Sequence, residues 1–171
     1  PAHGRLVQDV QGKWTYIPAA DYHGTDSFRY VVNDGVADSN LATINIDVKA
    51  VNDAPSLAGQ ELSVDEDAIL TLDLLSKATD VDGDALTVRI VNQPAHGQLL
   101  KDAQGKWTYQ PAANYHGADS FSYIVNDGSV DSALATVSIT VKAVNDTPVL
   151  GGQNLTVDED SVLALDLLSK A

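Results

Sequence analysis

Cysteine and methionine are absent from the 171 residues of the chain. Without cysteine, disulfide bonds cannot stabilise the fold, so another kind of constraint must stiffen any string of modules. Basic residues are also scarce: 10 Lys and Arg stand against 24 Asp and Glu, which gives a net charge of −14. A chain without a basic patch cannot neutralise phosphates, so we expect no nucleic acid as a partner.

Long apolar segments and catalytic motifs are missing as well. No run of 18 apolar residues occurs, so we expect no membrane insertion in this segment. The patterns Gly-x-Ser-x-Gly and His-Glu-x-x-His are absent, there is no cysteine nucleophile, and each of the four histidines precedes a glycine. We therefore expect that the chain is not an enzyme.

What the sequence does contain is a repeat. Residues 1–78 align without a gap with residues 94–171, at an offset of 93 residues, and 55 of the 78 aligned pairs are identical. Only residues 79–93 occur once. A unit of this length has the size of a whole domain rather than of one turn of a solenoid.

Proline-containing segments mark the domain boundaries. Residues 50–55 and 143–148 each follow a long alternating apolar run that proline cannot continue. We therefore predict one complete domain over residues 54–146, the C-terminal part of a preceding domain over 1–53 and the N-terminal part of a following domain over 147–171. Two interpretations stay open. The chain is a stretch of a longer array, which we favour, or the tail of one molecule packs against the head of the next in a head-to-tail fibre.

Apolar residues recur at every second position, which is the pattern of β-strands. The expected strands of one period cover residues 62–64, 70–74, 86–90, 97–100, 106–109, 121–125 and 135–141. Turn-forming pairs such as Asp82-Gly83 lie between them. About seven short strands predict an all-β fold, a Greek-key β-sandwich of immunoglobulin-like or cadherin-like plan repeated in tandem. Trp107 and Tyr109 are expected to pack in its core or on a sheet face, and residues 76–78 can form one helical turn.

Aspartates cluster in residues 80–84, which read Asp-Val-Asp-Gly-Asp. Alternate aspartates around a glycine can wrap oxygen ligands around a hard cation such as calcium. The segment is not an EF-hand loop, because its glycine is fourth rather than sixth and its twelfth position is Val91 rather than glutamate. Any site here would need ligands from elsewhere in the fold, and Asp-Gly is also an ordinary turn.

Other acidic motifs recur at fixed points of the repeat. Asp65-Glu66-Asp67 returns at residues 158–160, and three adjacent carboxylates repel one another unless a counter-ion is near. A solvated loop is the alternative interpretation. Asn and Asp also stand together in both linkers, at 52–53 and 145–146, where two domains must meet.

The motifs together resemble the bacterial cadherin-like tandem repeats of giant secreted adhesins, including the RTX type. The resemblance is carried by Asp-x-Asp at 80–82, Trp-Thr-Tyr at 107–109, Tyr-His-Gly-x-Asp-Ser-Phe at 115–121 and Val-Asn-Asp-x-Pro at 144–148. It covers essentially the whole chain. It implies Ca²⁺ ions at the domain junctions, held by the end of one domain, the linker and the start of the next.

Carried over to this sequence, the resemblance implies two sets of metal ligands. The set at the first junction is Asn52, Asp53, Asp80, Asp82 and Asp127. The set at the second junction is Glu66, Asn145 and Asp146. Asp119 and its counterpart Asp26 are additional candidates. Each linker has one Asn fewer than the cadherin pattern, and the Leu-Asp-Arg-Glu segment has no match, so we expect fewer ions per junction than in a cadherin.

The resemblance and the acidic linkers predict calcium-rigidified spacer repeats of a bacterial cell-surface adhesin. Such repeats are secreted, lie outside the cell and hold a distal binding domain away from it. Their expected partners are the neighbouring repeats of the same chain. The alternative is an adhesive module that binds a ligand itself or self-associates in a cadherin-like way, but near-identical repeats favour the spacer.

Overall fold

The computed structural model describes residues 1–149, 151, 152 and 154–165, and all of their regular secondary structure is β. The strands are β1 (Gly4–Gln8), β2 (Trp14–Pro18), β3 (Gly24–Tyr30), β4 (Ala42–Val48), β5 (Ser56–Leu57), β6 (Gln60–Asp65), β7 (Leu70–Leu72), β8 (Ala78–Thr79), β9 (Thr87–Asn92), β10 (Gly97–Lys101), β11 (Trp107–Pro111), β12 (Gly117–Asn126) and β13 (Ala135–Lys142). In this part of the chain no helix is long and apolar enough to cross a bilayer.

Strands β5 to β13 form a two-layer sandwich. The larger sheet has the order β6-β13-β12-β9, in which β6 runs parallel to β13 and the other pairs are antiparallel. The smaller sheet has the order β10-β11-β7, and β5 pairs with β8. Among the described strands, β5 to β13 pair only with one another. The all-β sandwich predicted from the period-two pattern is therefore confirmed.

The core lies between the two sheets. Strand β13 shows the alternation most clearly, because each residue from Ala135 to Val141 that points inward is buried and each residue between them is exposed. Tyr109, Tyr123 and Phe121 fill the space between the layers, and Trp107 packs partly buried against them. The prediction that Trp107 and Tyr109 pack in the core or on a sheet face is confirmed. Each fully buried side chain of this size contributes about 1.5–3 kcal/mol.

The helical turn expected at residues 76–78 is not formed, because the connection from β7 to β8 is a non-helical, hydrogen-bonded turn. It spans residues 74–77 and is closed by a hydrogen bond from Ala78 N to Leu75 O of 3.0 Å. Ala78 itself already belongs to β8, which pairs with β5. These two-residue strands are too short for an alternating pattern, so the sequence did not predict them.

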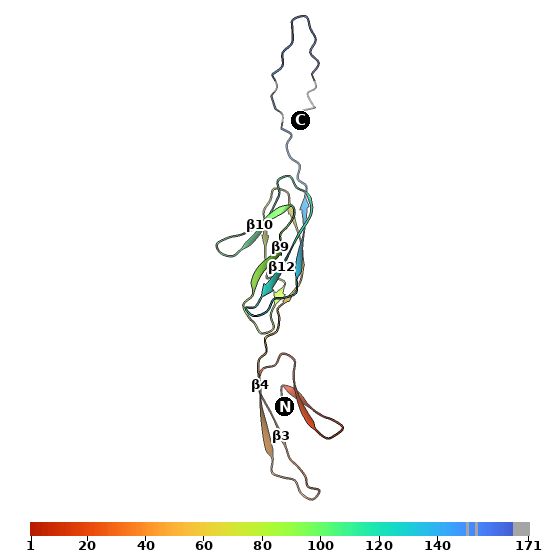
Figure 1. Ribbon diagram of the computed structural model, residues 1–171, viewed down its shortest axis with the longest axis vertical. Helices are drawn as coiled ribbons and strands as arrows, with labels where there is room; N and C mark the ends of the chain where they lie inside the picture. The colour runs from red at the N-terminus through yellow and green to blue at the C-terminus, as the bar shows by residue number, and fades with distance from the viewer. Residues whose placement is uncertain (150, 153, 166–171) are drawn as a thin grey trace.

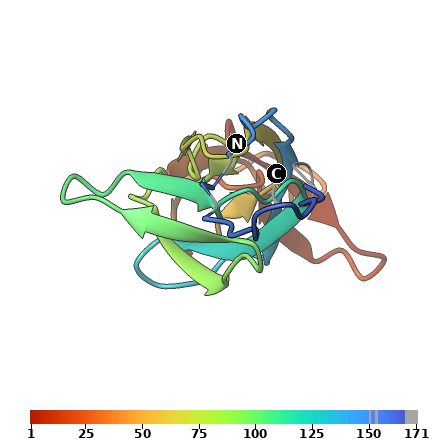
Figure 2. The ribbon, with the colours of Figure 1, turned by 90° about the horizontal axis from the view of Figure 1, so that it is seen from above.

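Residues 1–49 repeat only half of this architecture. The hairpins β1–β2 and β3–β4 have the same registers as β10–β11 and β12–β13. Residues 1–49 and the β5–β13 sandwich follow each other along the long axis of the molecule (Figure 1). Residues 154–165 extend beyond the end of the sandwich that faces away from residues 1–49. Seen from above, the hairpins β1–β2 and β10–β11 project to opposite sides (Figure 2).

Candidate metal centre at the domain junctions

The loop after β8 is organised around one aspartate. Asp80 Oδ1 accepts hydrogen bonds from the backbone N–H groups of Asp82, at 3.0 Å, and of Asp84, at 3.1 Å. Gly83 has a φ of 81°, a left-handed conformation that glycine adopts without strain. As a result, Asp80, Asp82 and Asp84 each place one carboxylate oxygen within 4.8 Å of the others.

The second oxygen of Asp80 points to a missing partner. Oδ2 is buried and has no hydrogen bond, and among the described residues no other buried side-chain oxygen or nitrogen is left in this state. An unpaired buried carboxylate oxygen is costly, because it has given up water without a replacement. An oxygen-only cluster with a free ligand atom fits a hard cation such as Ca²⁺, which takes six to eight oxygens.

The first linker is bonded to this loop and to its neighbour. Asp53 N donates to Asp82 Oδ2 at 2.8 Å, and Asn52 Nδ2 donates to Asp127 Oδ2 at 2.9 Å. Asp127, which follows β12, also accepts from Ser129 N at 2.6 Å and Val130 N at 2.7 Å. The structure thus connects all five residues expected at the first junction, and it adds Asp84, which the family resemblance did not supply.

Electrostatics keep Asp127 charged. The hydrogen bond from Asn52, followed by those from the backbone of Val130 and Ser129, lowers the pKa of the Asp127 carboxyl below its ordinary value. A carboxylate that stays ionised over the physiological range is available as an anionic partner for a cation at this junction.

The second junction has Glu66 at its centre. This side chain is only 7% exposed and lies just after β6. Its Oε1 accepts from Val144 N of the second linker at 2.6 Å, and its backbone N–H donates to Lys142 O at 2.8 Å. Asn145 Nδ2 donates to Asp146 O at 3.0 Å, which repeats the 3.1 Å bond from Asn52 Nδ2 to Asp53 O. Glu66 is therefore held against the linker that carries its expected co-ligands.

His116 is a neighbour that the sequence did not point out. Its Nδ1 lies 3.8 Å from Glu66 Oε2 at the second junction. The recurrence of Tyr-His-Gly in both repeats was the available signal. The ring adds a nitrogen beside an otherwise all-oxygen group.

Comparison with known protein families identifies the family of the chain. Residues 1–49 and 51–142 match the family model described as a cadherin-like domain. The chain belongs to this family. The cadherin-like sandwich expected from the sequence is thereby confirmed at the level of the fold.

Individual relatives are more distant. Integrin beta-like protein A of Dictyostelium discoideum is 30% identical over 113 residues, which cover 57% of this chain and 6% of that protein. Integrin beta-like protein E of the same organism is 26% identical over 147 residues, which cover 81% of this chain and 7% of that protein. The cadherin-like chain thus spans a small fraction of these curated relatives. Among solved structures, the EC1-2 fragment of human mucin-like protocadherin is similar, with a TM-score of 0.48, 20% identity and coverage of 84% of this chain and 80% of that one.

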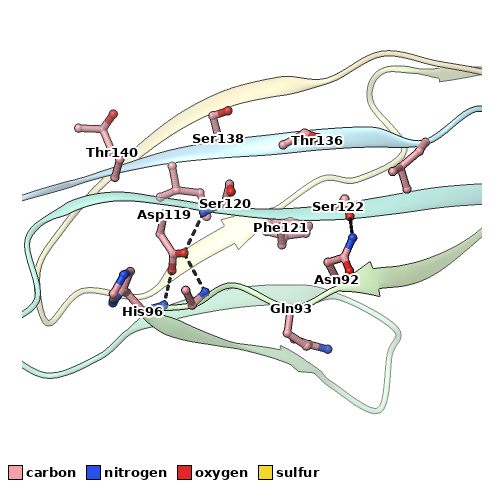
Figure 3. A pocket seen from close by; sticks show the side chains of 14 residues that line it. Asn92, Gln93, His96, Asp119, Ser120, Phe121, Ser122, Thr136, Ser138 and Thr140 are labelled. Carbon is pink, nitrogen blue, oxygen red and sulfur yellow. Dashed lines mark hydrogen bonds between the residues drawn. The ribbon is translucent and has the colours of Figure 1, made fainter.

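Asp119, a further expected ligand, has a different environment in the cadherin-like domain. Its carboxylate accepts four hydrogen bonds, from Ala95 N and His96 N, both at 3.0 Å, Ser120 N at 2.8 Å and Tyr109 Oη at 2.7 Å. Figure 3 shows it reaching from β12 to the backbone segment that leads into β10. The hydrogen bonds of Asp119 go to the sandwich and not to either linker, so its carboxylate ties two parts of the sandwich together.

Asp26 repeats this arrangement in the preceding half-domain. It accepts from Ala2 N, His3 N, Ser27 N and Tyr16 Oη. Burial, the hydrogen bond and the charge of Asp26 raise the pKa of Tyr16 to about 12. The aspartate of the Asp-Ser-Phe motif thus makes the same four hydrogen bonds in both repeats. We call this carboxylate, with its four donors, the latch.

The latch predicts a contribution of Asp119 to stability that depends on pH. Burial alone would raise the pKa of Asp119, but the bonds from Tyr109 and three backbone N–H groups outweigh it and hold the pKa below its ordinary value. Stability from such a group is present above the unfolded pKa, about 3.9, and is lost as the pH falls through the folded pKa. In urea titrations, the gap in unfolding free energy between the native protein and Asp119→Asn should be widest near neutral pH and narrow below about pH 3.9. A gap that stays constant down to pH 2 would contradict this assignment.

Proposed function

We propose that the chain is a calcium-rigidified spacer of an extracellular adhesive protein, with a structural rather than a catalytic role. The observation that carries the proposal is the free, buried Oδ2 of Asp80 within an aspartate cluster that is bonded to the interdomain linker. Asn52, Asp53, Asp80, Asp82, Asp84 and Asp127 would hold the ion at the first junction. Glu66, Asn145 and Asp146 would contribute at the second.

The mechanism follows from charge and linker length. Without a cation, the carboxylates around the linker repel one another, and the hydrogen bonds to Asp82 and Asp127 join the linker to the complete domain. A bound Ca²⁺ supplies the opposing charge and joins oxygens from both sides of the junction. Because the junction is then part of a binding site, bending it breaks ligand contacts, and the row of domains stays extended.

The setting we propose is a large secreted adhesin of the bacterial surface, in which the repeats carry a distal domain away from the cell. Extracellular modules bind calcium at about 10⁻⁴ to 10⁻³ M. A junction of this affinity is loaded outside the cell and empty inside it, so the array would become rigid only after export. The family membership and the integrin beta-like relatives support an adhesive context.

Small-angle scattering tests the proposal on the intact chain. With calcium at several millimolar, the maximum dimension of the molecule should increase relative to the same sample in chelator. The spread of molecular dimensions in the sample should become narrower. Glu61→Gln is a matched control, because it removes one carboxylate from an exposed position on β6 away from the junction loops. It should respond to calcium as the native protein does. An identical maximum dimension with calcium and with chelator would refute the spacer mechanism.

A further inference from the structure

Three Asp-Gly pairs occur in the chain, at residues 34–35, 82–83 and 127–128. An Asp-Gly bond is chemically labile, because glycine has no side chain that would shield its backbone nitrogen from the preceding carboxyl group. In water this nitrogen can attack the carboxyl carbon and convert the aspartate into isoaspartate. The three pairs share this chemistry, but the fold restrains them to different degrees.

Two of the pairs are closed by the same hydrogen bonds. Asp127 Oδ1 accepts from Ser129 N at 2.6 Å and from Val130 N at 2.7 Å, so its carboxyl faces the backbone that follows the glycine. Gly128 N donates to Asn126 Oδ1 at 2.8 Å, which occupies the nitrogen that would attack. The first pair along the chain has the same three bonds. Isomerisation at either pair must first break them.

The pair in the loop after β8 has neither restraint. Among the residues that the structure describes, the N–H of Gly83 has no hydrogen-bond acceptor, although the N–H groups of Asp82 and Asp84 beside it both donate to Asp80 Oδ1. The side chain of Asp82 is exposed, and its Oδ2 accepts a hydrogen bond from Asp53 N of the first linker, at 2.8 Å. The restraint on this carboxyl therefore comes from the linker and not from its own loop.

We propose that Asp82–Gly83 is a site of spontaneous isomerisation, which opens when the linker detaches from Asp82. The nitrogen of Gly83 forms a bond to Cγ of Asp82 while a C–O bond of the carboxyl breaks. The departing oxygen leaves as water with the amide proton and one proton from the solvent. A second water then cleaves the original C–N bond of the five-membered succinimide. The product is isoaspartate of unchanged mass, and water is the reactant that both steps share.

Isoaspartate at position 82 alters the loop that carries the candidate metal ligands. The main chain then runs through the former side chain and gains one methylene, while the carboxylate sits on a shorter branch. The bond from Asp84 N to Asp80 Oδ1 spans this position and would be lost. The carboxylate of residue 82 would also leave the group that it forms with the other two. A weaker calcium site is a consequence that rests on the proposed function, whereas the isomerisation itself does not.

Peptide mapping of the intact chain tests the site. In chelator at neutral pH and physiological temperature, isoaspartate should accumulate about tenfold faster at residue 82 than at residues 34 and 127, because those two carboxyls and their glycine nitrogens must first lose hydrogen bonds. Proteolysis followed by electron-transfer fragmentation assigns isoaspartate to single positions. In concentrated guanidinium chloride the three pairs should react at similar rates, since the folded surroundings are gone. Equal rates in the folded chain, or a preference for residue 82 that persists in denaturant, would overturn the proposal.

Asn52→Ala tests the role of the linker. The substitution removes the bond from Asn52 Nδ2 to Asp127 Oδ2 and leaves Asp82 and Gly83 unchanged. The linker should then detach more often, and isoaspartate at residue 82 should form several-fold faster in chelator. Asn145→Ala is the matched control, because it alters the same position of the second linker and should leave this rate unchanged. An unaltered rate in Asn52→Ala, or equal acceleration in both variants, would refute opening by the linker. Because chelator is present throughout, no result depends on the calcium mechanism.

Discussion

Replacement of Asp119 by alanine should lower the free energy of unfolding of the complete domain by about 3–5 kcal/mol. The substitution removes a carboxylate that accepts four hydrogen bonds and leaves the hydroxyl of Tyr109 and three backbone N–H groups without a partner. Tyr109 is 0% exposed, so its hydroxyl would lose its acceptor inside the core. Urea denaturation followed by Trp107 fluorescence in a Trp14→Phe background would measure the loss in this domain alone.

Two further variants serve as controls for Asp119→Ala. Asp26→Ala breaks the same four hydrogen bonds in the half-domain of residues 1–49 and should leave the transition of the complete domain in place. Tyr109→Phe removes one hydrogen bond and keeps the other three, so it should cost only about 0.5–1.5 kcal/mol. A loss below about 1 kcal/mol for Asp119→Ala would show that the latch does not hold the sandwich together.

The sheet layout explains why the fold was largely predictable. Each of the seven expected strands is present, because alternation of apolar and polar residues directly records which face of a strand is buried. The parallel pairing of β6 with β13 was beyond the sequence, since these strands lie far apart in the chain and their partners are set by tertiary packing. The same holds for β5 and β8, which have only two residues each.

The candidate site was only partly predictable from the sequence. Residue type and spacing identified the aspartates of the loop after β8, since their grouping is local. Asp119 is chemically the same residue, and nothing in the sequence distinguishes a carboxylate free to bind a cation from one that is saturated by hydrogen bonds. Its partners Ala95 and Tyr109 are 24 and 10 residues away, and only the strand register brings them together. The metal centre itself stays a prediction supported by the free Oδ2 of Asp80.

Asp80→Asn should reverse the sign of its effect on stability when calcium is added. An asparagine keeps the Oδ1 that accepts from Asp82 N and Asp84 N, but it replaces the unpaired Oδ2 and removes one charge from the cluster. In chelator the variant should therefore be as stable as the native domain or slightly more stable. At 10 mM calcium, sites with a Kd of about 10⁻⁴ to 10⁻³ M stabilise the native domain by about 1.4–2.7 kcal/mol, and the variant should lose most of that gain.

Thermal or urea unfolding of the intact chain, with and without calcium, measures both halves of this expectation. The difference in stability between the native domain and Asp80→Asn, compared with and without calcium, distinguishes a metal ligand from a structural aspartate. A structural role predicts that Asp80→Asn is less stable under both conditions by the same amount, whereas a ligand role predicts a deficit only with calcium. Glu61→Gln removes the same charge from an exposed strand position and should show the full native gain. If calcium stabilised Asp80→Asn as much as the native domain, Asp80 would not be a metal ligand. The metal centre at the first junction would then lose its main support.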